Sequence, residues 1–188
     1  MTIRAFQCFA SGSHTDMRGT SVTVTPARLQ TIAVAYNAHK QTRPAPLVLG
    51  HPDSNDTSYG TVRALIAEGG ALFAVAEVSF ALLSLVRTGR YKNVSASFHL
   101  PGSKDNPVGN EWYLRHVGFL GAVPPAVRGM QPVSFSCVDD FASYSASVTA
   151  PNESRNEQIH RVTKDILRAA PGAKLIDVAI RIDRALPR

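Results

Sequence analysis

The sequence predicts an α+β domain that is built on a mostly antiparallel, partly closed β-sheet with flanking helices. Two strand-like runs flank a Gly-Gly dipeptide, one segment has the apolar spacing of a helix, and the chain becomes rich in Ser, Ala and Asn after residue 143. A chain of 188 residues has room for one domain with a proper core and a short appendage. We therefore expect a domain over residues 1–144 and a linker with a helical tail over residues 145–188.

The N-terminal part predicts strands at 3–9 and 21–24, with a turn region at 11–19 between them. A helix follows, because Thr25 can cap its N-terminus and Pro26 suits its first position. Its apolar residues recur at the spacing of one buried face: Leu29, Ile32, Ala33 and Tyr36. This helix should pack on a sheet.

The middle of the chain predicts a short strand and then a hairpin. Leu47-Val48-Leu49 ends at Gly50, so this strand delivers His51 to a loop. Residues 57–78 contain two antiparallel strands that turn at Gly69-Gly70, a favoured hairpin dipeptide.

The remaining elements complete the prediction. A helix over 79–89 ends at Gly89, and strands follow at 92–98 and 111–120, while Val133 to Val138 closes the sheet. The tail from Ser154 to Leu186 has helical spacing, interrupted at Pro171-Gly172, with four apolar residues on one face: Ile159, Val162, Ile166 and Leu167.

Bulk properties exclude several classes of protein. The formal net charge is +6, and the basic residues are spread along the chain rather than concentrated in an arm, so nucleic acid is not specifically indicated. Cys8 and Cys137 are too few for a disulfide framework and lack the spacing of a structural zinc site. The N-terminus has no signal-peptide pattern, and no apolar run spans a bilayer, so we expect a soluble intracellular protein.

Two histidines and two serines are the candidates for chemistry. His51 lies at a strand end between Gly50 and Pro52, and His116 interrupts a largely apolar strand. In the strand over 92–98, a period of two sends Ser95 and Ser97 to one face, and the period does not choose between them. A serine nucleophile needs an adjacent base and a group that orients this base, and one serine with His51 and His116 would fill these roles.

The run from Leu47 to Arg128 resembles the Mu-like phage prohead protease family, which matures capsids. The resemblance rests on five segments in matching order: LVLGHP (47–52), GTVRAL (60–65), GGALFAVAEV (69–78), GRYKNVSASF (89–98) and YLRHVGFLGAVPPAVRG (113–129). These proteases are similar to the wider class of tailed-phage prohead proteases and herpesvirus assemblins. In that class a histidine, a serine and then a second histidine or an acid follow one another in the chain.

The resemblance implies a serine endopeptidase with Ser95 as nucleophile, His51 as base and His116 as third member. Ser95 is preferred over Ser97 because the nucleophile of related phage proteases stands three residues before a phenylalanine, which corresponds to Phe98. The expected substrates are the scaffold protein, the major capsid protein and the chain itself, within an assembling prohead in the host cytoplasm. A homo-oligomer is a further expectation. Peptide-bond hydrolysis of this kind would need no cofactor.

The sequence departs from part of the class at two positions. Ser97 stands where one branch has glycine, and His116 where that branch has an acid, which predicts slow turnover. Backbone amides near Ser97, or water held by Arg128 after Pro124-Pro125, are candidates for stabilising the oxyanion. Arg115 should point to the face opposite His116.

Two other functions stay open. His51, Asp53 and His116 have the residue types of metal ligands, although their spacing matches no standard metal motif. Alternatively, the chain is a scaffold or capsid-assembly protein that keeps a protease fold without its activity. The tail would then be an assembly contact, although it could equally pack on its own domain.

Overall fold

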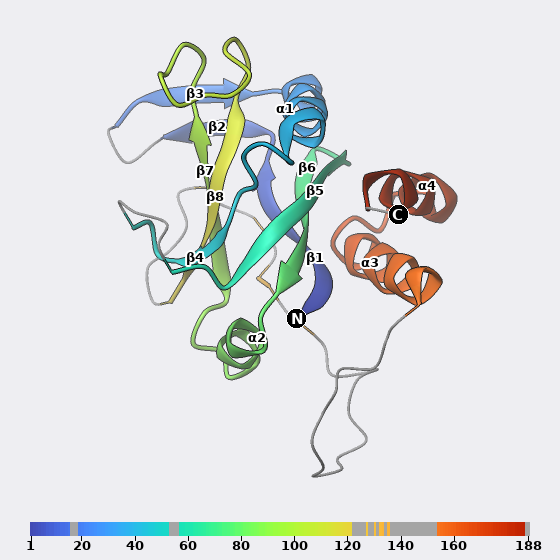
Figure 1. Ribbon diagram of the computed structural model, residues 1–188. Helices are drawn as coiled ribbons and strands as arrows, with labels where there is room; N and C mark the ends of the chain where they lie inside the picture. The colour runs from blue at the N-terminus through green and yellow to red at the C-terminus, as the bar shows by residue number, and fades with distance from the viewer. Residues whose placement is uncertain are drawn as a thin grey trace.

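A computed structural model describes residues 1–15, 19–52, 57–121, 127, 130, 132–133, 135 and 154–186 (Figure 1). Its strands are β1 (Thr2–Ala10), β2 (Gly12–Thr15), β3 (Ser21–Val24), β4 (Leu47–Leu49), β5 (Gly60–Glu68), β6 (Ala71–Val78), β7 (Asn93–His99) and β8 (Tyr113–Leu120). Its helices are α1 (Pro26–His39), α2 (Phe80–Arg87), α3 (Arg155–Ala169) and α4 (Leu175–Ala185). The α+β class is confirmed.

The described strands form three small sheets. One has the order β1-β6-β5 and is antiparallel throughout, one is the pair β2-β3, and one has the order β4-β8-β7. In the third sheet β7 is antiparallel to β8, whereas the short β4 is parallel to it. Most of the pairing is therefore antiparallel, as predicted.

The sheets do not join into a closed barrel within the described residues. A single bridge between Pro46 and Thr61 links the β4 side to β5, and β1 meets the third sheet through side chains. The ring centroids of Phe6 and Phe119 lie 5.3 Å apart, and those of Phe9 and Phe98 lie 5.1 Å apart. Aromatic packing thus holds these two sheets together where backbone pairing is missing, which corrects the expectation of a partly closed sheet.

Local sequence signals explain the predicted helices. Thr25 accepts a hydrogen bond from the Arg28 amide at 3.1 Å, and the four predicted residues are the buried face of α1. Ser79 caps α2 in the same way, and Gly89 ends it with φ +73°. Ser154 and Glu157 form a capping box at the start of α3.

The structure differs from the sequence-based expectation near the N-terminus. The region 11–19 was predicted as a turn, but residues 12–15 pair with 21–24 as β2, so this prediction was wrong. Val133 and Phe135 are buried in the core, and neither belongs to a strand of the described chain. The rest of 133–138, and the predicted boundary near Ser145, lie outside the described residues.

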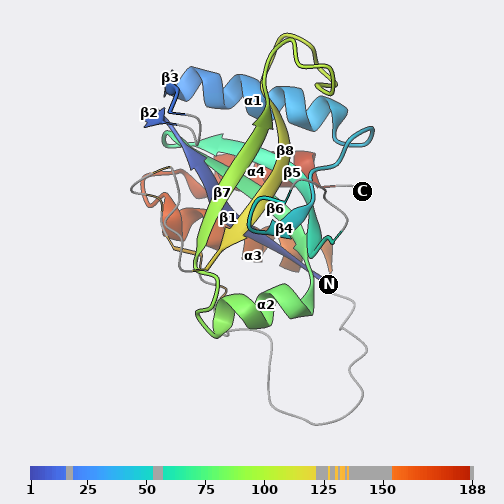
Figure 2. The same cartoon turned by 90° about the vertical axis from the view of Figure 1, so that its left-hand side faces the viewer.

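The two larger sheets and the tail form layers. In Figure 2, β7 and β8 cross in front of β1, β5 and β6, and α3 and α4 lie behind them. The main core fills the space between the sheets and α1, and a second apolar cluster lies between the first sheet and the two tail helices. Val162 and Ile166 of α3 are fully buried in that cluster. The tail therefore packs on its own domain, which is one of the two alternatives that the sequence left open.

Within the described chain, none of the four helices has both the length and the apolar character needed to cross a bilayer.

Candidate active site

The two predicted histidines are in direct contact. His51 Nδ1 and His116 Nε2 lie 2.8 Å apart, within hydrogen-bond distance, and the ring centroids are 5.1 Å apart. His116 comes from β8, while His51 follows β4, and these two strands are paired. The backbone pairing of β4 with β8 therefore brings the two rings together.

The fold places His51 through a tight turn. Gly50 has φ +70°, a conformation that glycine adopts freely, and its amide donates to the Phe119 carbonyl at 2.9 Å. The chain thus stays attached to β8 for one residue beyond β4 and then turns. His51 follows directly, with its ring directed back over the sheet toward His116.

Strand register relates the two serines to this pair. Ser95 pairs with Gly118, and Ser97 pairs with His116. Because the side chains of paired residues in an antiparallel sheet lie on the same face, both serines share the face that carries the His116 ring. The opposite face is the core, where Val94 and Val117 are buried. The predicted grouping of Ser95 with Ser97 is confirmed.

The position of the His51 ring distinguishes the serines. A Cβ atom on Gly118 would lie 3.2 Å from His51 Cε1, so the ring lies over Gly118. Ser95 is paired with Gly118, so the Cβ atom of Ser95 lies about 5 Å from the position that a Cβ atom on Gly118 would occupy. The Nδ1 atom of His51 is directed to His116, the partner of Ser97. The Cε1 atom lies over Gly118, the partner of Ser95, so this edge of the ring is on the side of Ser95. No hydrogen bond joins Ser95 to His51 among the described residues, and such contacts often close only when substrate binds.

The histidines favour the neutral form. Burial lowers the pKa of His116 to about 4, with smaller contributions from His51, Arg115 and His99, and only 1% of its surface is exposed. Burial and then the Arg115 charge lower the pKa of His51. A neutral His51 can donate from Nδ1 to His116 and keep Nε2 as a proton acceptor. This is the tautomer that a general base requires.

The regular alternation of side chains along β8 is interrupted at Arg115. β8 has a register shift at this residue, since Ser97 pairs with His116 while the next residue, Phe98, pairs with Leu114. Arg115 is therefore the extra residue of a bulge, where strict alternation does not apply. Its charge lowers the pKa of both histidines of the pair. It belongs to the electrostatic surroundings of the site.

Other groups are less suited to chemistry. Burial raises the pKa of the Cys8 thiol to about 12, so this thiol is not a nucleophile near neutral pH. No group of three potential ligands for a metal occurs among the described residues, and Asp53 lies outside them. Arg128 and Pro124-Pro125, named for the oxyanion, also lie outside them, as does Cys137.

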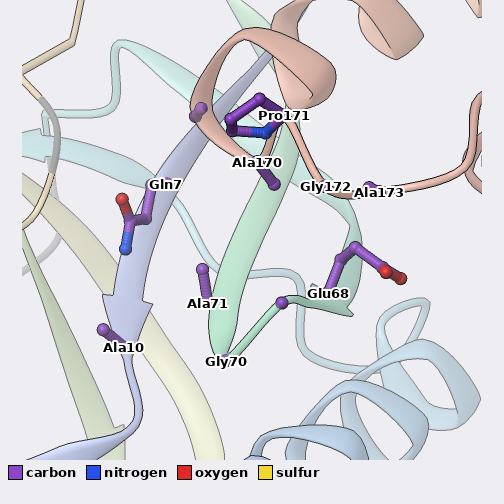
Figure 3. A pocket seen from close by; sticks show the side chains of 11 residues that line it. Gln7, Ala10, Glu68, Gly70, Ala71, Ala170, Pro171, Gly172 and Ala173 are labelled. Atoms are coloured by element: carbon purple, nitrogen blue, oxygen red, sulfur yellow. The ribbon is translucent and has the colours of Figure 1, made fainter.

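A hollow in the surface lies between the β5–β6 turn and the turn that joins α3 to α4 (Figure 3). Its walls are mostly small residues, with Gln7 and Glu68 as the longer polar ones. None of its lining residues belongs to the candidate site, so the hollow is not a substrate pocket for the histidine pair.

Comparison with solved structures finds herpesvirus proteases. A structure of the Kaposi's sarcoma-associated herpesvirus protease with a hexapeptide phosphonate inhibitor aligns with a TM-score of 0.47 and 15% identity over 94% of this chain and 79% of that one. A structure of the same viral protease with a dimer disruptor gives 0.43 and 16% over 93% and 92%. Likeness at this level establishes no activity. No protein-family model matches the chain, and no curated protein matches its sequence significantly.

Proposed function

We propose that the chain is a serine endopeptidase with Ser95 as nucleophile, His51 as general base and His116 as the residue that orients His51. The observation that carries the proposal is the 2.8 Å contact of His51 with His116, in which the His51 ring lies over Gly118, the register partner of Ser95. A nucleophile, a base and an orienting group are the parts that a hydrolase of this type needs.

The reaction follows from these roles. Ser95 Oγ attacks the peptide carbonyl carbon and its proton passes to His51 Nε2, which then gives the proton to the leaving amine as the C–N bond breaks. Water next attacks the acyl-serine, His51 takes the water proton, and Ser95 leaves with a proton from His51. His116 Nε2 accepts the Nδ1 hydrogen throughout and stabilises the transient His51 cation.

His116 shapes the expected rate. Its imidazole is neutral, because burial holds its pKa at about 4, so it stabilises the His51 cation less than a carboxylate would. We therefore expect slow turnover, which suits an enzyme that acts once per particle.

The biological setting belongs to the same proposal and rests on the family-like sequence segments between Leu47 and Gly129. The chain would mature phage capsids inside the prohead, in the host cytoplasm, by trimming the scaffold and major capsid proteins and by cleaving itself. It would act as a homo-oligomer and need no cofactor or metal.

The test uses Ser95→Ala with Ser97→Ala as a matched control, since both serines lie on one face of β7. Mass spectrometry of each purified chain, before and after incubation with its capsid protein, measures self-cleavage and trimming. Ser95→Ala should abolish both, a loss of at least about 10³-fold, whereas Ser97→Ala should keep them.

Cleavage that continues unchanged in Ser95→Ala would remove Ser95 as the nucleophile and with it the proposal. A wild-type chain that cleaves neither itself nor the capsid protein would favour the non-catalytic assembly protein. A chelator separates the metal-dependent alternative, because a serine peptidase stays active in its presence.

A further inference from the structure

We propose that Gly118, through its contact with Gly50, is a positioning residue that holds His51 over Ser95; this inference rests on the proposed function. Gly118 is the residue of β8 that pairs on one side with Ser95 and on the other with Val48 of β4. Glycine in the middle of a strand gives no side-chain packing and often marks a place where another backbone approaches closely.

The backbone of Gly50 approaches Gly118 more closely than any side chain at position 118 would permit. A Cβ atom there would lie 2.1 Å from the Gly50 carbonyl oxygen, 3.1 Å from its carbon and 3.2 Å from His51 Cε1. The nearest atoms belong to backbone and not to the end of a flexible side chain. Even alanine at 118 therefore requires the turn at Gly50 to move away from the sheet.

A movement of the turn is transmitted directly to His51. The Gly50 amide donates a hydrogen bond to the Phe119 carbonyl of β8. This hydrogen bond to β8 holds the Gly50 carbonyl over Gly118, the neighbour of Phe119 in that strand. His51 is the next residue, and its Nδ1 lies 2.8 Å from His116 Nε2. Since a hydrogen bond weakens steeply beyond about 3.2 Å, a shift of about one ångström breaks this contact.

The chain provides two matched glycines that separate positioning from ordinary packing. A Cβ on Gly60 of β5 would lie 2.0 Å from the Glu77 carbonyl oxygen, which is an equally close approach in a strand that contributes no residue to the site. A Cβ on Gly172, between α3 and α4, would meet nothing within 4 Å. Gly60→Ala therefore reports the effect of a backbone clash outside the histidine pair, together with the strain of an alanine at φ +149° and a contact at 3.1 Å with the Leu47 side chain. Gly172→Ala reports the effect of the added methyl group itself.

The experiment compares Gly118→Ala with Gly60→Ala and Gly172→Ala in the full chain. Nuclear magnetic resonance follows the titration of the histidine ring protons, and a fluorophosphonate probe measures the reactivity of Ser95 in the folded fraction. In Gly118→Ala the pKa of His116 should rise toward its ordinary value of about 6.5, and labelling of Ser95 should slow by about 100-fold. Gly60→Ala should lower the unfolding temperature, and Gly172→Ala should change little; both should keep the titration and the labelling of the wild type.

A folded Gly118→Ala chain that keeps both readouts overturns the inference. If this variant does not fold, Gly50→Val decides, because a β-branched residue disfavours φ +70° and displaces the same turn without adding an atom to β8. Gly50→Val should change both readouts in the same way, and an unchanged titration in that variant also overturns the inference.

The two readouts keep this inference distinct from the proposed function. A wild-type chain that never reacts with the probe contradicts the serine mechanism. The histidine titration still reports whether Gly118 positions the ring.

Discussion

At the scale of single residues, the fold holds two uncharged imidazoles against each other at the edge of the core. His116 lies on the face of β8 away from the core, yet only 1% of its surface is exposed. Burial disfavours its cation, and the Arg115 charge acts in the same direction. The pair is therefore uncharged at neutral pH and can accept one proton.

The depressed pKa of His116 predicts that stability depends on pH. The pKa of His116 is near 6.5 in the unfolded chain, whereas burial lowers it to about 4 in the folded chain. The contribution of His116 to the free energy of unfolding should therefore be constant above about pH 6.5 and should fall by up to about 3 kcal/mol between pH 6.5 and pH 4. Burial also lowers the pKa of His51 and His99, so they add to the loss. Urea unfolding at a series of pH values measures this slope.

The His116→Asn variant tests this assignment. It should flatten the pH dependence between about pH 6.5 and 4, because one of the groups that resists protonation is gone. The exposed His39 of α1 provides the control, and His39→Asn should keep the wild-type slope. A slope that is the same in wild type and His116→Asn would show that His116 is not the source of the pH dependence.

At the scale of secondary-structure elements, the sequence predicted most of what local signals determine. The Thr25 cap, the apolar face of α1 and the Gly69-Gly70 turn depend on neighbours in the chain, and all three were correct. The strand β2 was missed because Gly12 to Thr15 is polar and its pairing with β3 is not encoded by an apolar alternation. Local pattern is a weak guide to such exposed strands.

The candidate site was predictable only where neighbouring residues in the sequence determine it. The period of two correctly put Ser95 and Ser97 on one face, but it could not foresee the bulge at Arg115, which depends on the register between two strands. The role of Gly118 was also missed, although glycine inside an apolar strand was a usable signal of a close backbone approach. The contact of His51 with His116 needed the parallel pairing of β4 and β8, which residue patterns do not specify.

A buried ion pair joins α3 to β1. Asp165 accepts hydrogen bonds from the Arg4 guanidinium at 3.4 Å and from the Ala5 amide at 3.3 Å, and both charged side chains are almost fully buried. Burial raises the pKa of Asp165 more than Arg4 lowers it, so desolvation outweighs the attraction. The pair therefore fixes where the helix docks more than it stabilises the fold.

Breaking and replacing this pair should have different effects. Asp165→Ala should lower the free energy of unfolding by about 3 kcal/mol, because the buried Arg4 charge loses its carboxylate. The double variant Arg4→Met with Asp165→Leu should recover most of this loss, since two apolar groups need no hydrogen-bond partner. Denaturant unfolding of the single variants Arg4→Met and Asp165→Leu and of the double variant measures the coupling between the two side chains. A double variant as unstable as Asp165→Ala would show that the pair contributes net stability.

At the scale of the whole molecule, the tail completes the fold as a third layer. Ala64, Ile66 and Phe73 lie on the face of the first sheet that is turned toward α3 and α4. The same helices are tied to the sheet at two further places, through Arg161 to the Ile3 carbonyl and through Arg181 to Glu68. Without them this face of the sheet would meet water.

Removing residues 154–188 should therefore destabilise the entire domain. Each large apolar side chain that loses its cover costs about 1.5–3 kcal/mol, and several such losses match the total stability of an ordinary domain, about 5–15 kcal/mol. The truncated chain should aggregate or melt far below the full chain, as measured by thermal unfolding and by binding of a dye for exposed apolar surface. The control is Ile176→Lys with Ile180→Lys, which changes only exposed positions of α4 and should leave the unfolding temperature within a few degrees. A truncated chain as stable as the full one would mean instead that the tail is a separate segment, available for assembly contacts.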